Sequence, residues 1–296
     1  MSSSEVYIQQ LGSVGFPAAP EVVLRLSQLL RTEWVRAEQL AEVAMLDATV
    51  SARVLRLANS VYYRGKGVKS IAEAVIRIGI DGVRDVVYAL SLMRTLRPMQ
   101  FSHRQYWRHC LAVAQATQIL QLRARKAVVS PSELHAAGLL HDIGMLVLDR
   151  TLGVGYGRIL ANAHESGRPL FEVEREMIDT DHADVGARLL ETWHLPESLV
   201  QATAAHHDPA GEGDPAAQIV YLADFVCNLH AVHHGTAYRP EGSVSDVWNA
   251  LGIDERELPE ILTEVDASLD KADAILAVAR VAIAGRPPPT ERSQIA

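Results

Sequence analysis

The residues most able to do chemistry are histidines and aspartates in the middle of a 296-residue chain. An adjacent pair, His141-Asp142, stands inside the strongly apolar segment Leu139–Gly144, where two polar side chains are costly to bury unless something satisfies them. Imidazoles and carboxylates suit a borderline-hard divalent metal, and a bridging aspartate can hold two ions close enough to activate one water. A His-Asp dipeptide alone is weak evidence, so the prediction depends on its companions.

Five companions stand at defined places in helix-forming segments. They are His109 on the preceding helix, His182 at the start of a later one, His206 and His207 at a helix end, and Asp224 within the apolar segment IVYLADFVCNL. Each taken singly is more often a packed or exposed residue. The other histidines, which have no comparable place in this order, are His103, His135, His164, His194, His230, His233 and His234.

The elements that must position these residues all show the helical period, with few alternating β-branched runs. Helices are predicted at 20–30, 36–46, 49–59, 70–79 and 81–96, then at 104–126, 131–148, 155–166, 169–178, 181–193, 197–207 and 214–234, with two or three more in 240–284. Ser70 with Glu73 forms a capping box, and Ser130-Pro131 marks another helix start. The sequence therefore predicts an all-α fold.

Breaks in this pattern divide the chain into five parts. An N-terminal segment covers 1–15, and a helical lobe covers 16–98 and ends at Arg97-Pro98. A second lobe at 99–235 carries the histidines and aspartates. A C-terminal helical extension covers 236–284, and the proline-rich tail at 285–296 is predicted to be disordered.

Several short strings resemble HDOD domains, a branch of the HD metal-dependent phosphohydrolase superfamily. These strings, within residues 16–210, are Phe16-Pro17-Ala18-Ala19-Pro20, Arg56-Leu57-Ala58-Asn59-Ser60, Ile71-Ala72-Glu73-Ala74, Tyr106-Trp107-Arg108-His109 and His182-Ala183-Asp184-Val185-Gly186. The resemblance implies a two-lobed helical bundle, with an N-terminal lobe packed on an HD-like lobe. It also implies a regulatory role in bacterial signalling.

The order of histidines and aspartates follows the HD superfamily pattern, which implies a site for one or two divalent ions. The implied ligands are His109, His141, Asp142, His182, His206, His207 and Asp224. Iron, manganese, nickel and zinc all tolerate such ligands, so the metal is left open. We expect the seven side chains to converge in space.

The sequence also resembles the HD-GYP cyclic-dinucleotide phosphodiesterases, but departs from them at two points. Met145 stands where those enzymes carry a lysine, and Asp208-Pro209 follows the His206-His207 pair in place of a glycine-tyrosine-proline loop. We therefore expect a regulatory module that is non-catalytic or weakly catalytic and acts by binding a signalling protein or a nucleotide. The alternative is an active metal-dependent phosphohydrolase of a nucleotide or cyclic dinucleotide, in which Asp142 orients the nucleophilic water.

Charge is unevenly distributed along this chain of net charge −8. Residues 53–126 carry about +11, which leaves about −19 elsewhere. Candidate residues for an anion-binding wall between the lobes are Arg53, Arg56, Arg64, Lys66 and Lys69. Solvated helix faces, or ion pairs with acids of the other lobe, explain the same charges. The overall acidity disfavours direct nucleic-acid binding.

Two further features bound the setting of the protein. No apolar run is long enough to cross a bilayer, and the N-terminus has no signal-peptide pattern, so we expect a cytoplasmic protein without a membrane partner. The two cysteines, Cys110 and Cys227, have no second cysteine at metal-clip spacing and are predicted to be buried free thiols.

Overall fold

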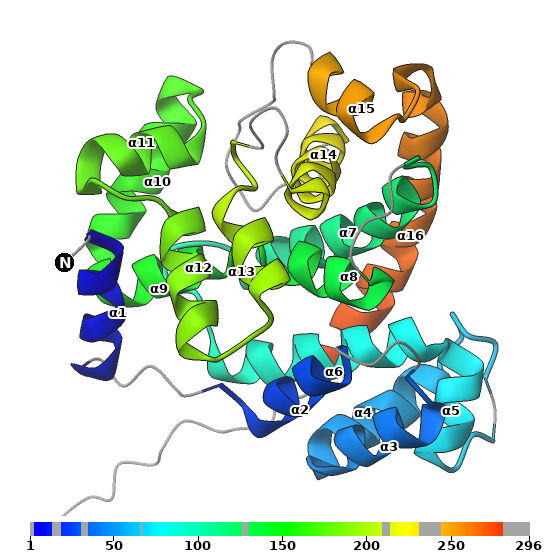
Figure 1. Cartoon of the computed structure of the whole chain (residues 1–296). Helices are drawn as coiled ribbons and strands as arrows, with labels where there is room; N and C mark the ends of the chain where they lie inside the picture. The colour runs from blue at the N-terminus through cyan, green and yellow to red at the C-terminus, as the bar shows by residue number, and fades with distance from the viewer. Residues whose placement is uncertain are drawn as a thin grey trace, which may run out of the picture.

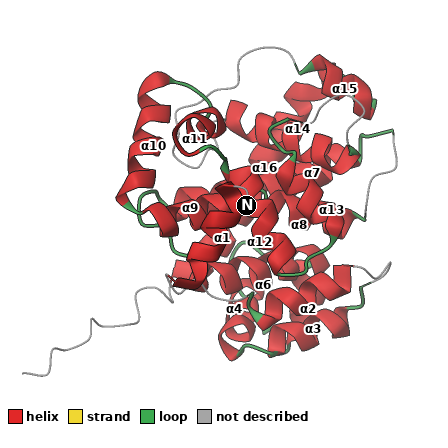
Figure 2. Cartoon of the chain, turned by 60° about the vertical axis from the view of Figure 1, so that its left-hand side comes forward, coloured by secondary structure: helices red, strands yellow, loops and turns green. Residues whose placement is uncertain are grey.

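A computed structural model describes residues 3–13, 19–30, 35–65, 67–125, 130–208, 214–230 and 244–280 of the chain. Within these residues the regular structure is helical and contains no strand, as Figure 2 shows. This confirms the prediction of an all-α fold. The predicted disordered tail, 285–296, and Lys66 lie outside the described residues.

The N-terminal lobe consists of five short helices, drawn in blue and cyan in Figure 1. They are α2 (Glu21–Leu30), α3 (Ala37–Met45), α4 (Ala48–Ala58), α5 (Ile71–Ile78) and α6 (Ile80–Thr95). The Asp47 side chain caps α4, and the Ser70 hydroxyl accepts from the backbone N–H of Glu73 at the start of α5. Gly79, at a φ of 85°, turns the chain directly from α5 into α6.

The second lobe consists of eight helices that surround the histidines and aspartates. They are α7 (His103–Gln121), α8 (Pro131–Leu140), α9 (Ile143–Leu152), α10 (Val154–Ser166), α11 (Leu170–Ile178), α12 (His182–Thr192), α13 (Glu197–Ala204) and α14 (Pro215–Leu229). The core beneath them is apolar and includes Trp107 and Tyr156, both fully buried. Cys110 and Cys227 are buried free thiols, as predicted.

The single helix predicted at 131–148 is broken in the structure. Its two halves, α8 and α9, are separated by His141 and Asp142, which form a turn. At this turn the start of α9 lies against α12, because a Cβ on Gly144 would stand 1.9 Å from the carbonyl oxygen of His182. The apolar periodicity continues through both halves, so it does not reveal the break. The turn directs both polar side chains into the lobe.

Helices at the two ends of the chain extend the second lobe. The N-terminal segment forms α1 (Ser3–Ser13), which contacts α9 and α12 and therefore belongs spatially to the second lobe (Figure 1). At the C-terminal end lie α15 (Ser245–Leu251), the short η1 (Glu255–Glu257) and the long α16 (Leu258–Arg280). No helix among the described residues is long and apolar enough to cross a membrane.

Helix α16 connects the two lobes. It lies along α7 and also contacts α4 and α6 of the N-terminal lobe. Arg123, in the turn just after α7, pairs with Glu264 at 2.6 Å, and Arg108 of α7 pairs with Asp273 at 3.2 Å. Asp149 of α9 holds the segment between α6 and α7, since its carboxylate accepts from the backbone N–H groups of Met99 and Gln100.

Candidate metal centre

The seven predicted ligands come from separate elements and meet inside the second lobe. His109 lies on α7, His141 and Asp142 lie in the turn between α8 and α9, and His182 is the first residue of α12. His206 and His207 lie in the turn after α13, and Asp224 lies on α14. All seven are buried or half-buried, so none points into solvent. The expected convergence is what the structure shows.

Four of the seven form a first group around one oxygen of Asp142. His109 Nε2 lies 3.1 Å from Asp224 Oδ1 and 3.3 Å from His141 Nε2. Asp142 Oδ2 lies 3.2 Å from His141 Nε2 and 3.5 Å from His109 Nε2. This group, which we call the inner group, combines two imidazoles and two carboxylates.

The other three histidines gather at the second oxygen of the same carboxylate and form, with Asp142, the outer group. His182 Nε2 lies 3.2 Å and His206 Nε2 lies 3.6 Å from Asp142 Oδ1. His207 Nε2 lies 2.7 Å from His182 Nε2. Asp142 therefore presents one oxygen to each group, which is the arrangement a carboxylate bridging two ions requires.

Contacts on the far side of the rings fix their orientation. Nδ1 of His141 donates to the Gly138 carbonyl at 2.8 Å, and Nδ1 of His206 donates to the Thr203 carbonyl at 2.6 Å. A histidine whose Nδ1 carries the proton presents the lone pair of Nε2. Both rings therefore direct Nε2 as a donor for a cation toward Asp142.

The electrostatics of the cluster favour ionised carboxylate and, for two of the rings, neutral imidazole. Burial raises the pKa of Asp142, but the adjacent His141, His182 and His206 hold this pKa well below its ordinary value. Burial lowers the pKa of His206 and lowers that of His207 further. Deprotonated carboxylate and neutral imidazole are the forms that bind metal ions.

The donor set fits a divalent ion on two observations. His206 Nε2 is fully buried and makes no hydrogen bond with the described residues. The Nε2 atoms of His182 and His207 face each other at 2.7 Å, a contact that is repulsive without a proton or a cation between the two lone pairs. The residues present can thus hold a metal, whose identity their chemistry leaves open among iron, manganese, nickel and zinc.

A carboxylate and a phenol behind His182 were not identified from the sequence. Glu174 of α11 is fully buried, and its Oε2 lies 2.5 Å from His182 Nδ1. The hydroxyl of Tyr156 donates to Glu174 Oε1 at 2.7 Å. The only sequence signal is an acid on the apolar side of an amphipathic helix, since Val173 beside it is also buried. Burial lowers the pKa of His182, but Glu174 and Asp142 raise it well above its ordinary value.

His135, which the sequence left as background, belongs to a second buried polar cluster. Its Nε2 donates to Asp85 of α6, and this carboxylate also lies 3.0 Å from Lys271 Nζ of α16. Gln115 of α7 donates to the same carboxylate at 3.0 Å and accepts from Lys271 at 3.2 Å. We call these four residues the junction network, because they join α6 of the N-terminal lobe to α7, α8 and α16.

The anion-wall candidates do not form the single face predicted for Arg53 and Arg56. Arg53 is buried and donates to the Ala279 carbonyl of α16 at 3.2 Å, whereas Arg56 is exposed. The spacing of three residues places both on neighbouring helix positions, but α16 covers one of them. Arg64 and Lys69 are exposed.

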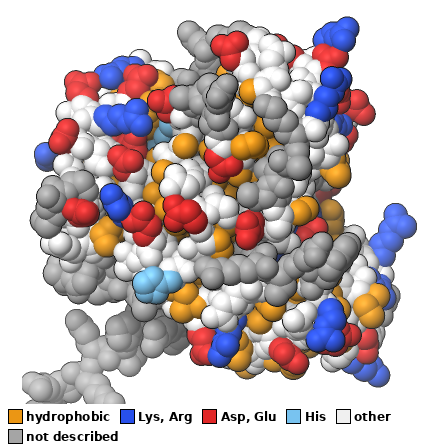
Figure 3. Space-filling view, viewed as in Figure 1, with side chains coloured by type: hydrophobic (Ala, Val, Ile, Leu, Met, Phe, Trp, Pro, Cys, Tyr) orange, Lys and Arg blue, Asp and Glu red, His pale blue; other side chains and the backbone are white. Residues whose placement is uncertain are grey.

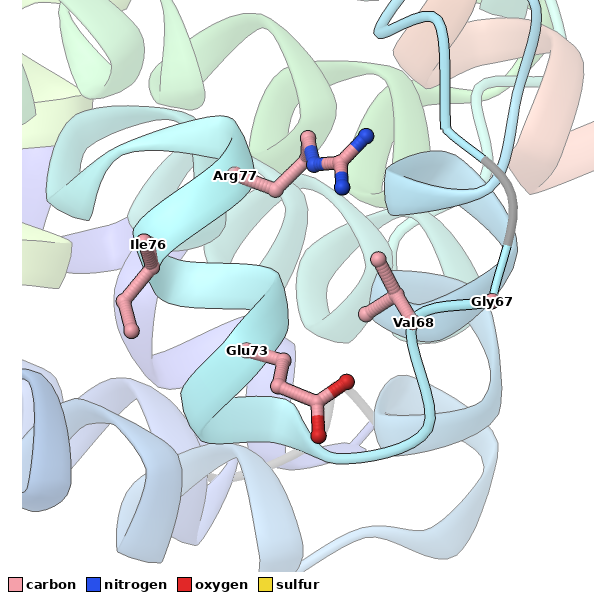
Figure 4. A pocket seen from close by; sticks show the side chains of 5 residues that line it. All are labelled: Gly67, Val68, Glu73, Ile76 and Arg77. Atoms are coloured by element: carbon pink, nitrogen blue, oxygen red, sulfur yellow. The ribbon is translucent and has the colours of Figure 1, made fainter.

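A shallow pocket of about 350 Å³ lies next to Arg64 and Lys69, on α5 and the preceding loop (Figure 4). It is lined by Gly67, Val68, Glu73, Ile76 and Arg77. Ile76 is 82% exposed, and Arg77 donates to the Arg64 carbonyl at 3.4 Å. Figure 3 shows Lys and Arg side chains mixed with acids along the outer edge of this lobe.

The position that distinguishes this chain from the HD-GYP enzymes is buried. Met145 lies in the first turn of α9, three residues after Asp142, and has no exposed surface. A lysine ammonium there would have to leave the core or find a buried partner. The structure thus places an apolar side chain where a phosphate-neutralising cation would be needed.

Solved structures share this fold. An HDOD domain protein of unknown function from Geobacter sulfurreducens is 24% identical, with a TM-score of 0.75 over 93% of this chain and 97% of that one. A candidate signal transduction protein from Marinobacter aquaeolei VT8 is 23% identical, with a TM-score of 0.79 over 91% and 61%. A candidate phosphohydrolase from Shewanella amazonensis SB2B is 22% identical, with a TM-score of 0.69 over 92% and 97%.

Sequence comparison assigns the family. An uncharacterized protein of Treponema pallidum is 24% identical over 194 residues, which are 65% of this chain and only 37% of that protein. The model of the HDOD domain matches residues 16–209, a range that holds the whole N-terminal lobe and all predicted ligands except Asp224. The chain therefore belongs to the HDOD domain family.

Proposed function

We propose that the protein is a signalling regulator that holds one or two divalent ions and acts by binding a protein or a nucleotide, with little or no hydrolytic turnover. The proposal is supported by a complete set of ligands together with an apolar residue at the position next to it. The ligand atoms of the outer group lie within 4.8 Å of one another, and so do those of His109, His141 and Asp142 in the inner group. Met145, buried beside them, supplies no charge to a substrate phosphate.

In this proposal the residues of the chain would hold the ions and orient the ligand side chains. Asp142 bridges the inner and outer groups through its two oxygens, and the Nδ1 contacts of His141 and His206 fix those rings. Bound ions would supply Lewis acidity and would neutralise the carboxylates. Since Asp224 and His207 are the half-buried members, they mark the open side of the centre.

The alternative function is an active metal-dependent phosphohydrolase of a nucleotide or cyclic dinucleotide. It is favoured by the bridging position of Asp142, which a two-ion mechanism needs in order to place a water between the ions. In that case Asp142 would be catalytic as well as a ligand. The similar fold of a candidate phosphohydrolase is compatible with either function.

Metal analysis combined with a hydrolysis assay separates the two functions. We expect purified protein to contain at least one transition metal ion per chain and to hydrolyse cyclic di-nucleotides no faster than its Asp142→Ala variant. The matched control is His164→Ala, because His164 is exposed and outside the centre. Metal-dependent hydrolysis that Asp142→Ala abolishes and His164→Ala preserves would establish the phosphohydrolase instead.

We also propose a binding surface for a partner protein or a nucleotide at the shallow pocket on α5 (Figure 4). Arg77 and the exposed aliphatic Ile76 are among its lining residues, and Arg64 and Lys69 lie next to it along the chain. We call Arg64, Lys69 and Arg77 its rim. Cations around an apolar side chain suit an acidic group attached to an apolar body. Glu73, whose carboxylate accepts from the backbone N–H of Lys69 at 2.9 Å, is one acid beside three cations, so the local charge stays positive.

Charge reversal at this rim tests the surface. We expect Arg64→Glu combined with Arg77→Glu to weaken binding of a fluorescent cyclic dinucleotide or of an acidic partner at least tenfold, with an unchanged melting temperature. Arg158→Glu on α10 is the control, since Arg158 is exposed and distant in the chain. Lost stability with unchanged binding would show that these cations serve ion pairs within the fold.

A further inference from the structure

Helix α11 contacts two ligands of the outer group, and also the N-cap residue next to one of them. Phe171, Glu174 and Arg175, all within five consecutive residues, each contact a different part of that group or its support. Apart from these contacts, α11 packs mainly on α10, and the two helices stand at one edge of the molecule in Figure 1. A helix at the edge of the molecule thus contacts two ligands of one group and a residue that supports one of them.

The first contact is a ring stack. The ring of Phe171 lies on the ring of His207, with centroids 4.4 Å apart and planes inclined by 18°. The guanidinium carbon of Arg175 lies 5.1 Å from the centre of the Phe171 ring. His207 follows a helix end and is half-buried, and the stack limits rotation of its ring together with the contacts to His182 and His206.

The second contact fixes the proton of His182. Glu174 Oε2 accepts from Nδ1 of His182 at 2.5 Å and from its backbone N–H at 3.0 Å. Tyr156 of α10 holds the other oxygen of Glu174. A carboxylate on the far nitrogen of a ligand histidine sets its tautomer and makes it a stronger donor.

The third contact supports the start of α12, whose first residue is His182. Arg175 Nε donates to Asp181 Oδ2 at 2.6 Å, and the other oxygen of Asp181 accepts from the backbone N–H of Asp184 at 2.9 Å. Asp181 is the N-cap of α12, so Arg175 positions the cap that orients His182.

From these contacts we infer that α11 is the positioning element of the outer group, and that an ion bound there and the α10–α11 pair hold each other in place. The inference rests on the proposed metal function. Linkage makes the effect reciprocal: if α11 strengthens binding of the ion, the ion stabilises α11 by the same factor. Binding of an ion at the buried site would then change the stability of α10 and α11, which lie at the edge of the molecule.

Metal titration tests whether α11 strengthens binding of the ion. After removal of bound ions, Mn²⁺ is titrated calorimetrically into the wild type, Phe171→Ala and Glu174→Gln. Loss of a contact that orients a ligand histidine lowers metal affinity about 10–100-fold, and we expect this loss in both variants. Met177→Ala is the control because Met177 lies on the exposed side of α11. Phe171→Tyr keeps the ring and should restore binding.

Hydrogen exchange tests the reciprocal half. We expect removal of the ion to raise exchange at least tenfold in α10 and α11 and to leave α5, in the other lobe, unchanged. Glu174→Gln with Mn²⁺ present should resemble the wild type without it. This readout does not depend on any enzymatic activity.

The outcomes separate the inference from the proposed function. If the wild type binds no ion, the metal function fails and the inference fails with it. If the wild type binds Mn²⁺ and both variants bind it equally well, only the role of α11 is overturned. Equal exchange of α10 and α11 with and without the ion would overturn the reciprocal coupling. Should Phe171→Ala unfold, Glu174→Gln and Phe171→Tyr still decide the question.

Discussion

Replacing Lys271 by methionine should destabilise the protein strongly although the lysine is not among the candidate metal ligands. Its ammonium is 3.0 Å from Asp85 Oδ2, and the Asp85 side chain has no exposed surface. Methionine keeps the length and apolar stem of lysine and removes only the charge. The variant therefore leaves a buried carboxylate without its cation.

The size of this loss in stability depends on the hydrogen bonds that Asp85 keeps in the variant. Removing one partner of a buried pair typically costs about 3–5 kcal/mol. Full protonation of Asp85 at pH 7 would cost roughly 4 kcal/mol, at about 1.4 kcal/mol for each pH unit above its ordinary pKa, and this sets an upper limit. Because His135 and Gln115 still donate to the carboxylate, we expect about 3 kcal/mol.

Urea unfolding followed by circular dichroism measures this loss. At about 2–4 °C for each kcal/mol, a loss of about 3 kcal/mol corresponds to roughly 6–12 °C in melting temperature. Lys69→Met is the matched control, because Lys69 is exposed. The double variant Asp85→Asn with Lys271→Met should recover most of the loss, since a neutral pair needs no buried cation. The reasoning is refuted if Lys271→Met and Lys69→Met lose the same free energy of unfolding.

Three further outcomes are expected. Chelation of bound ions should lower the melting temperature by about 5–10 °C, since a ligand at 100 times its dissociation constant adds about 2.7 kcal/mol, and re-addition of Mn²⁺ should reverse this in a thermal scan. Burial raises the pKa of Asp85, but His135 and Lys271 hold this pKa far below the ordinary 3.8, so the Asp85–Lys271 pair stabilises the fold above about pH 4 and this stabilisation is lost on further acidification. In a pH series of urea unfolding, Asp85→Asn with Lys271→Met should therefore lose less stability than the wild type below pH 4. Gly144→Ala should cost about 1–3 kcal/mol in urea unfolding because its Cβ would meet the backbone of α12, and equal stability of Gly144→Ala and wild type would contradict that packing.

The helices were predictable because their signals are local. Capping residues and apolar spacing lie within a few positions of one another, and the predicted bounds of α4 and α5 differ from the structure by one residue at each end. The break at His141-Asp142 was not predictable in the same way. It depends on contact between α9 and α12, whose residues lie about 40 positions apart in the chain.

The candidate ligands were predictable because the order of histidines and aspartates resembles a known family. The residues that hold these ligands in place follow no such sequence pattern. Glu174 is one acid among several in α11, and Asp85 and His135 are separated by 50 residues and lie on different helices. Arg53 was misplaced for the same reason, since the helix that covers it begins more than 200 residues later.

The metal centre and the junction network lie along the same two helices. On α7, Gln115 follows His109 by six residues, and on α8 and the turn after it, His141 follows His135 by six. Six residues of helix span about 9 Å, so each helix carries a ligand toward one end and a network residue toward the other. Tight packing makes such helices move as units rather than bend.

This arrangement makes α16 part of the working unit although the family match ends at residue 209. Lys271 of α16 is the cation that compensates Asp85, and the Ala279 carbonyl of α16 accepts from Arg53 of the N-terminal lobe. A domain cut at the family boundary would expose the apolar face of α7 and leave the buried carboxylate without its cation. The positions of α7 and α8, and with them the candidate ligands that these helices carry, thus depend on a helix outside the matched domain.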